Sequence, residues 1–350
     1  MQQQTCGEAL TRLLQAYGVD TVFGIPGVHT IELYRGLKNA TLQHITPRHE
    51  QGAGFMADGY ARVTNKPGVC FIITGPGMTN IVTAMGQALQ DSIPMLVISS
   101  VNRTQQLSMG EGRLHELPNQ LAITSQVCRY SHTLLSADNL PKVMAQAFAV
   151  FGSQRPGPVH IEIPIDVLAA DASHIDMQPW PMPKAPAPDI DSIKQAASLL
   201  SSAKKPLMII GGGAKNVDST AQKLAEKLNM PVVNTCNGKG VMPPNHPLFI
   251  GSTPSHPAIR EAIEQNADVV LAVGTELSET DYDFFFLGDL NINGKLIRID
   301  IDSAQLLRNH KPDLPILSDS QLALNAIFAQ LPTQNEDASS EVLAYCDSLR

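Results

Sequence analysis

Three apolar segments near the start of the chain each lead through a turn-forming loop into a predicted helix. The loop segments are residues 24–27, 48–54 and 74–80, and the first and third are glycine-rich loops that each follow an apolar strand. Repeated strand–loop–helix units predict an α/β fold with a doubly wound parallel sheet. In such a sheet ligands bind at the carboxyl ends of the strands, so the three loops predict a single site.

Glu50 has the most informative position in these loops. It follows the predicted strand 42–45 and Pro47, and Ala53 and Ala57 then begin a helical apolar spacing. An acid in the first turn of a helix suits the helix dipole and needs no further function. Position alone therefore favours helix capping, whereas the two neighbouring glycine-rich loops favour a chemical role.

In order and spacing, the strings GIPG, RHEQGAG and TGPGMTN closely resemble the pyrimidine-binding domain of the thiamine-diphosphate enzymes of the acetolactate synthase and 2-oxoacid decarboxylase family. The resemblance implies that Glu50 is catalytic: it would hydrogen-bond the pyrimidine ring nitrogen of thiamine diphosphate and assist the proton transfer that activates the cofactor. It also implies a cofactor pocket shaped by Gly24, Pro26, Gly27, Thr74, Pro76 and Asn80.

A long polar loop at residues 101–126 interrupts the strand–helix alternation, and long loops in compact domains are often functional. Acetolactate synthases carry a Phe-Gln-Glu motif there, whose glutamine reaches the active site. This chain has Leu114, His115 and Glu116 instead, which argues against strict acetolactate synthase activity. We predict that His115 and Glu116 face the substrate, with solvent exposure as the alternative for His115.

The remaining pattern predicts a second doubly wound parallel-sheet domain that resembles the Rossmann-like central domain of the family. We assign the pyrimidine-binding domain to residues 1–170, a proline-rich linker to 171–188 and the central domain to 189–331. Residues 332–350 read as a tail leading to a third, diphosphate-binding domain that this sequence does not contain.

Nucleotide binding by the central domain has weak support in the sequence. The glycine run 211–213 follows a predicted strand, but Asn216 stands where a dinucleotide fingerprint has its third glycine, so a tight strand-to-helix turn is favoured. Some relatives bind FAD through arginines after a strand like 269–273. Here the turn 274–280 carries acids, so FAD is not expected, although Arg155 matches a family arginine.

The acids near this turn have two interpretations: a solvated loop, or a site for a cationic substrate tail. Together with the loop around His115, they resemble the branch of the family that decarboxylates 5-guanidino-2-oxopentanoate. Magnesium, which the family binds through a Gly-Asp-Gly motif, is expected only through the absent third domain. The nearest string in this chain, at residues 288–291, lacks the second glycine.

The composition sets limits on location and partners. A net charge of −8 and a pI near 5.7 suggest neither nucleic-acid nor membrane binding. Five scattered cysteines without a CxxC pair favour a reducing cytoplasm over a disulfide framework. The resemblance implies a homodimer or homotetramer.

These observations predict a thiamine-diphosphate-dependent decarboxylase or carboligase of small 2-oxoacids. The alternatives are an acetolactate synthase large subunit and a non-catalytic two-domain partner or remnant.

Overall fold

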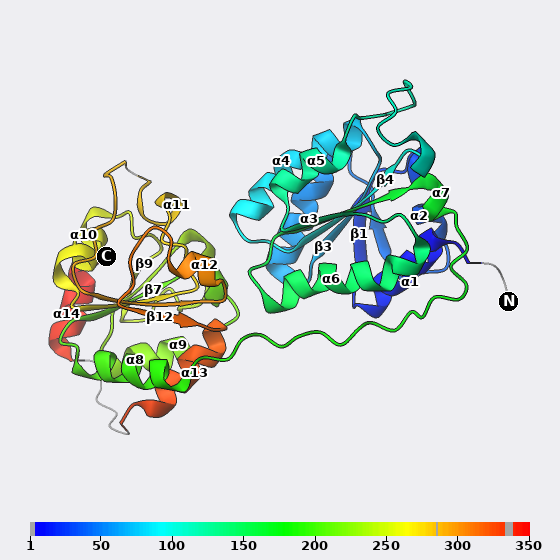
Figure 1. Cartoon of the computed structure of the whole chain (residues 1–350). Coiled ribbons are helices and arrows are strands. Elements are labelled where there is room, and N and C mark those ends of the chain that lie inside the picture. The colour runs from blue at the N-terminus through cyan, green and yellow to red at the C-terminus, as the bar shows by residue number, and fades with distance from the viewer. Residues whose placement is uncertain (1–3, 285, 333–338) are drawn as a thin grey trace. The chain divides into compact units, whose positions relative to one another are not determined.

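The structure is a computed structural model that describes residues 4–284, 286–332 and 339–350. The chain divides into two compact units, Met1–Lys184 and Ala185–Arg350, each built around a six-stranded sheet (Figure 1). Every strand pair in both sheets is parallel. The predicted α/β class with two doubly wound parallel sheets is confirmed.

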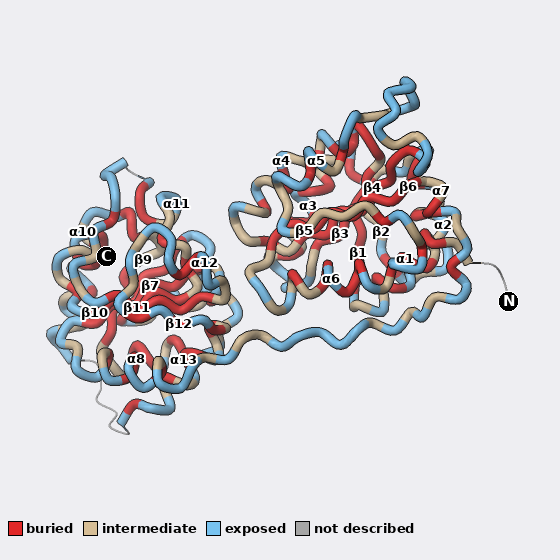
Figure 2. The backbone as a smooth tube through the Cα atoms, viewed as in Figure 1, coloured by how far each residue is buried: buried red, intermediate tan, exposed pale blue. Residues whose placement is uncertain are grey.

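The first sheet has the strand order β2-β1-β3-β4-β6-β5. Its central strands are buried along their whole length between two helical layers, as Figure 2 shows in red. Such burial explains why these strands are almost entirely apolar. The strands are β1 (Thr21–Gly24), β2 (Gln43–Ile45), β3 (Gly68–Ile72), β4 (Met95–Val101), β5 (Tyr130–Thr133) and β6 (Pro158–Pro164).

Two separate apolar cores hold the helices of this unit against the sheet. One core contains side chains of α3 and α4, and the other contains side chains of α1 and α6. The helices are α1 (Cys6–Ala16), α2 (Ile31–Leu37), α3 (Glu50–Thr64), α4 (Pro76–Gln90), α5 (Gln120–Thr124), α6 (Leu140–Ser153) and α7 (Ile165–Leu168), and a 3-10 turn, η1 (Val28–Thr30), precedes α2.

The second sheet has the order β12-β11-β10-β7-β8-β9. Its strands are β7 (Pro206–Ile210), β8 (Val232–Asn234), β9 (Phe249–Gly251), β10 (Val269–Val273), β11 (Lys295–Asp300) and β12 (Leu314–Leu317). Its helices are α8 (Ile190–Ser202), α9 (Thr220–Leu228), α10 (Pro257–Glu261), α11 (Glu279–Tyr282), α12 (Ser303–Leu306), α13 (Ser320–Gln330) and α14 (Ser340–Leu349).

The C-terminal segment differs from the tail expected at residues 332–350. Residues 339–350 contain α14, which buries Cys346 and Leu349 in the core of the second unit. Ser339 caps this helix by accepting the Val342 N–H. Residues 333–338 lie outside the described part of the chain.

A buried arginine organises the loops at one end of the second sheet. Arg298 of β11 is only 1% exposed. Its Nη1 donates to the carbonyls of Leu306 and Arg308, and its Nη2 donates to those of Thr275 and Glu276. Burial lowers the pKa of Arg298, and the carbonyl oxygens replace the water that the guanidinium loses.

Candidate functional site

The three loops that the sequence singles out emerge side by side. They follow β1, β2 and β3, which are adjacent and parallel in the order β2-β1-β3. All three strands therefore end at the same edge of the sheet, where ligands bind in open α/β folds.

Glu50 is the first residue of α3 and is half-buried. The preceding residue, His49, caps the helix through Nδ1, which accepts the Gln51 N–H at 3.1 Å. The Glu50 side chain is therefore not needed to cap the helix. Its Oε2 accepts a hydrogen bond from Asn80 Nδ2 at 2.8 Å. Two predicted site residues from different loops are thus in direct contact.

Two glycines leave bare backbone around Ile73, next to this carboxylate. A Cβ on Gly27 would lie 2.5 Å from Ile73 Cδ1. A Cβ on Gly77 would lie 2.6 Å from Ile73 Cγ2 and 3.5 Å from Glu50 Oε1. Any larger residue at either position would collide with Ile73, so the two glycines let the loops after β1 and β3 pack closely around Ile73 beside Glu50.

Gly24, in contrast, is required by packing within the sheet. A Cβ there would lie 2.2 Å from the Phe71 carbonyl oxygen, so a larger residue would push β1 away from β3. Pro26 and Pro76 are exposed, and Pro76 occupies the first turn of α4, where its missing N–H costs nothing.

We expect Gly24→Ala to lower the free energy of unfolding by about 1–3 kcal/mol, because overpacking forces backbone shifts. Urea denaturation of the wild-type protein and of the Gly24→Ala variant would measure the difference. Gly59 in α3 is the matched control, since a Cβ there meets nothing within 4 Å. Gly59→Ala should raise stability by about 0.5–1 kcal/mol. Equal effects of the two changes would contradict this account of Gly24.

Gln120 holds the loop after β3 in place, a role that the sequence did not reveal. Its side chain is 3% exposed. Its Oε1 accepts from Thr74 Oγ1 at 2.9 Å and from the Gly75 N–H at 3.0 Å. Its Nε2 donates to Glu162 Oε2 at 3.0 Å and to Ser99 Oγ at 3.1 Å. Thr74, predicted to shape the pocket, therefore bonds to Gln120.

Glu162 and His160 of β6 extend this buried polar network. Burial raises the pKa of Glu162, whose other oxygen accepts from Thr133 Oγ1 at 2.7 Å. His160 is fully buried, with Nε2 2.8 Å from Ser99 Oγ and Nδ1 2.8 Å from Thr124 Oγ1. Burial lowers the pKa of His160 to about 3 from 6.5.

The depressed pKa of His160 predicts a loss of stability in acid. Below pH 6.5 the unfolded chain binds a proton that the folded chain excludes until about pH 3. Stability should therefore fall with decreasing pH across this window, by up to about 1.4 kcal/mol per pH unit from this residue. Urea titrations at several pH values should give a shallower slope for His160→Gln, and an unchanged slope would contradict the prediction.

The two loop residues predicted to face the substrate have different surroundings. The Glu116 carboxylate accepts hydrogen bonds from the N–H groups of Gly110 and Arg113, so it stabilises the loop to which it belongs. His115 has a φ of 57°, and its carbonyl oxygen would lie 2.4 Å from a Cβ on Gly75. His115 therefore packs on the loop after β3, and a substrate role for Glu116 stays a prediction.

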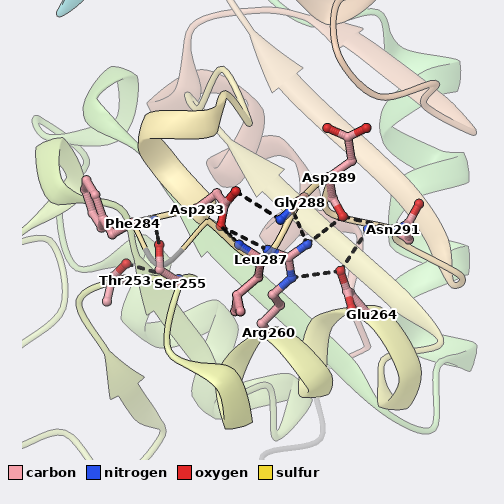
Figure 3. Close-up of polar contacts among 10 residues, drawn as sticks. All are labelled: Thr253, Ser255, Arg260, Glu264, Asp283, Phe284, Leu287, Gly288, Asp289 and Asn291. Atoms are coloured by element: carbon pink, nitrogen blue, oxygen red, sulfur yellow. Dashed lines mark hydrogen bonds and ion pairs between the residues drawn. The ribbon is translucent and has the colours of Figure 1, made fainter.

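In the second unit, the carboxylates near the turn after β10 accept hydrogen bonds from hydroxyl and backbone N–H groups of the protein. Asp281 accepts from Thr275 Oγ1 at 2.9 Å. Asp283 accepts the Leu287 and Gly288 N–H groups, and Arg260 ties the same loop to α10 (Figure 3). These contacts favour a structural role for both carboxylates over a site for a cationic tail.

The glycine run after β7 packs against the loop after β10. The Gly213 N–H donates to the Gly274 carbonyl at 2.9 Å, and a Cβ on Gly211 would lie 2.3 Å from that oxygen. This close approach explains why glycine is needed there and supports the tight strand-to-helix turn that the sequence favours for residues 211–213.

Two kinds of feature are absent from the part of the chain that the structure describes. No helix there combines the length and apolar character needed to cross a membrane. Within the same residues, no group of three or more His, Cys, Asp or Glu side chains is arranged to hold a metal ion.

Comparisons with known proteins agree with the geometry. Residues 4–123 match the family described as thiamine pyrophosphate enzyme, N-terminal TPP binding domain, and residues 193–327 match the central domain of these enzymes. The chain is 47% identical over 340 residues to the probable 2-ketoarginine decarboxylase AruI of Pseudomonas aeruginosa, covering 96% of this chain and 59% of that protein.

Acetolactate synthases are also similar. The large subunit of isozyme 1 from Escherichia coli K12 is 35% identical over 335 residues, covering 93% of this chain and 57% of the relative. The Mycobacterium bovis enzyme is 34% identical over 350 residues, with coverages of 95% and 54%. The chain thus spans a little over half the length of these curated relatives. It belongs to the thiamine pyrophosphate enzyme family, of which it carries the N-terminal cofactor-binding domain and the central domain.

Proposed function

We propose that this chain is part of a thiamine-diphosphate-dependent 2-oxoacid decarboxylase whose substrate is 5-guanidino-2-oxopentanoate, the oxoacid of arginine. The observation that carries the proposal is the contact between Glu50 and Asn80 beside the bare backbone of Gly77. The similarity to a probable 2-ketoarginine decarboxylase supports the choice of substrate. The imidazole of His115, where acetolactate synthases have a glutamine, supports decarboxylation over carboligation.

The residues at the sheet edge fit the pyrimidine of the cofactor. Gly27 and Gly77 let the two loops pack closely against Ile73, and Glu50, beside Gly77, would hold a proton against a ring nitrogen. Asn80 would fix the direction of the Glu50 carboxylate through its hydrogen bond. When bound, thiamine diphosphate supplies the electron sink for loss of carbon dioxide.

The other predicted pocket residues contribute indirectly in this proposal. Gly24, Pro26, Thr74 and Pro76 would set the backbone paths of the two glycine-rich loops, and Glu116 would keep the loop around His115 closed.

The wider proposal covers partners and location. Mg2+ would bind the cofactor diphosphate through a domain outside this chain. The complete protein would form a homodimer or homotetramer in the cytoplasm. The proposal does not include FAD as a cofactor, because the turn after β10 carries Glu276 and Glu279 in place of arginines.

The test uses the complete natural protein with thiamine diphosphate and Mg2+. Decarboxylation consumes one proton and converts 5-guanidino-2-oxopentanoate into carbon dioxide and 4-guanidinobutanal, in equal amounts. Both products should appear together. Acetolactate formation from pyruvate, without the aldehyde, would favour an acetolactate synthase. Absence of carbon dioxide release from any 2-oxoacid would favour a non-catalytic partner.

A further inference from the structure

The second unit contains a cavity at the amino ends of its central strands. The cavity has a volume of about 530 Å³. Its walls include Pro206, Pro231 and Ala267, which stand at or just before the starts of β7, β8 and β10. These strands are adjacent and parallel in the order β10-β7-β8. The cavity therefore lies at the opposite edge of the sheet from the glycine run 211–213 and the turn 274–280.

Helix α14 and the neighbouring core supply part of the cavity wall. Val342 and Tyr345 of α14 line the cavity, while Cys346 of the same helix is buried in the core and holds the helix in place. Leu207 and Leu228 add apolar surface. A hollow of this size with largely apolar walls and a few polar groups is typical of sites for small molecules.

Two neighbouring lysines give the cavity a positive charge. Lys204 and Lys205 both line it, and both are exposed to solvent. Among the described residues that line the cavity, Glu341 is the one acid. This local excess of positive charge contrasts with the net charge of −8 for the whole chain. The cavity therefore offers an anion an attraction that the chain as a whole does not.

The backbone of both lysines is fixed beside the cavity, whereas their side chains are not committed to an acid. Asp268 Oδ2 accepts the Lys204 N–H at 2.7 Å, and Asp268 Oδ1 accepts the Lys205 N–H at 2.9 Å. Neither ammonium group forms an ion pair with a described residue. Because lysine carries its charge on a flexible four-carbon stem, each ammonium group can turn toward an anion in the cavity.

We propose that this cavity binds a small organic anion. The negative group of the ligand would pair with Lys204 and Lys205. The apolar part of the ligand would pack against Leu207, Leu228 and Val342. Carboxylates and phosphate esters share this chemistry. The site contains no residue of the proposed cofactor pocket, so the proposal goes beyond the proposed function and does not depend on it.

Titration calorimetry of the complete natural protein tests the proposal with three probes: pentanoate, pentyl phosphate and pentanol. At least one of the two anions should bind about tenfold or more tightly than pentanol, because only an anion can pair with the lysines. Binding of pentanoate alone would identify carboxylates as the ligand class. Binding of pentyl phosphate alone would identify phosphate esters.

Variants separate the contribution of charge from that of space. Lys204→Gln/Lys205→Gln should weaken binding of the anion by about tenfold and leave pentanol unchanged. Lys194→Gln/Lys223→Gln removes the same charge from two exposed lysines that do not line the cavity, and its effect should stay below about twofold because solvent ions screen distant charges. Val342→Trp should weaken binding of every probe by filling the cavity. Thermal unfolding checks that each variant folds.

Chemical labelling gives the location of the site independently. Acetic anhydride acetylates accessible lysine amines, and mass spectrometry of peptides measures the extent of labelling at each lysine. A saturating concentration of the anion that binds should slow the labelling of Lys204 and Lys205. The labelling of Lys194 should not change.

The proposal would be overturned by any of the following results: neither anion binds more tightly than pentanol, the two double-lysine variants lose the same affinity, or the anion leaves the labelling of Lys204 and Lys205 unchanged. None of these measurements involves turnover. Their outcome therefore decides on the cavity whether or not the complete protein decarboxylates a 2-oxoacid.

Discussion

Glu50→Gln is expected to lower kcat/KM of the complete, cofactor-loaded protein by about 10²–10⁴-fold, the usual contribution of a positioned acid or base. Glutamine keeps the shape of the side chain, and its carbonyl oxygen can still accept from Asn80 Nδ2. It cannot hold or release the proton, so the loss should fall on turnover and not on folding. Steady-state kinetics and thermal unfolding, measured together, check both parts.

The matched control is Glu341→Gln, the same change in the first turn of α14. Glu341 is exposed, and we expect its replacement to leave kcat/KM within about twofold and stability within about 0.5 kcal/mol. Near-normal turnover by Glu50→Gln would remove the basis for a catalytic role of Glu50.

Gln120→Leu should destabilise the first unit by about 3 kcal/mol or more. The change leaves the Gly75 N–H, Thr74 Oγ1 and one oxygen of Glu162 without their partner, and each buried unpaired group costs about 1–3 kcal/mol. Urea denaturation followed by circular dichroism would measure the effect.

Gln126→Leu provides the comparison for Gln120→Leu. Gln126 is exposed, and its amide contacts only the neighbouring Ser125 Oγ among the hydrogen bonds of the described residues. Its replacement should change stability by no more than about 0.5 kcal/mol. A similar, small effect at both positions would show that the Gln120 network contributes little.

The strands predicted from the sequence are the ones that lie inside the sheets, together with β2. The predicted ranges are 21–25, 42–45, 69–74, 95–99, 159–163, 207–210, 232–234, 269–273 and 296–301. Most residues of the interior strands are apolar and buried, since helices cover both faces of the sheets. The three strands that the sequence analysis missed, β5, β9 and β12, all lie at sheet edges. Edge strands are short and partly exposed, and β12 contains Pro315, so their pattern resembles a loop.

The proximity of candidate site residues was predictable where they follow strand ends in order, whereas their role in cofactor binding stays a prediction. Glu50 and Asn80 stand at two such ends, and the structure brings them into contact. Gln120 gave no signal, because its role depends on Glu162, a neighbour distant in the sequence. Such contacts arise only from the tertiary fold.

Arg298 suggests an order of events as the second unit folds. Its guanidinium binds carbonyls from the loop before β11 and from the segment after it. Neither segment can gain these bonds until β11 has aligned with β10 and carried the arginine into place. Both segments should therefore become ordered after the folding transition state, and substitutions within them should speed unfolding more than they slow folding.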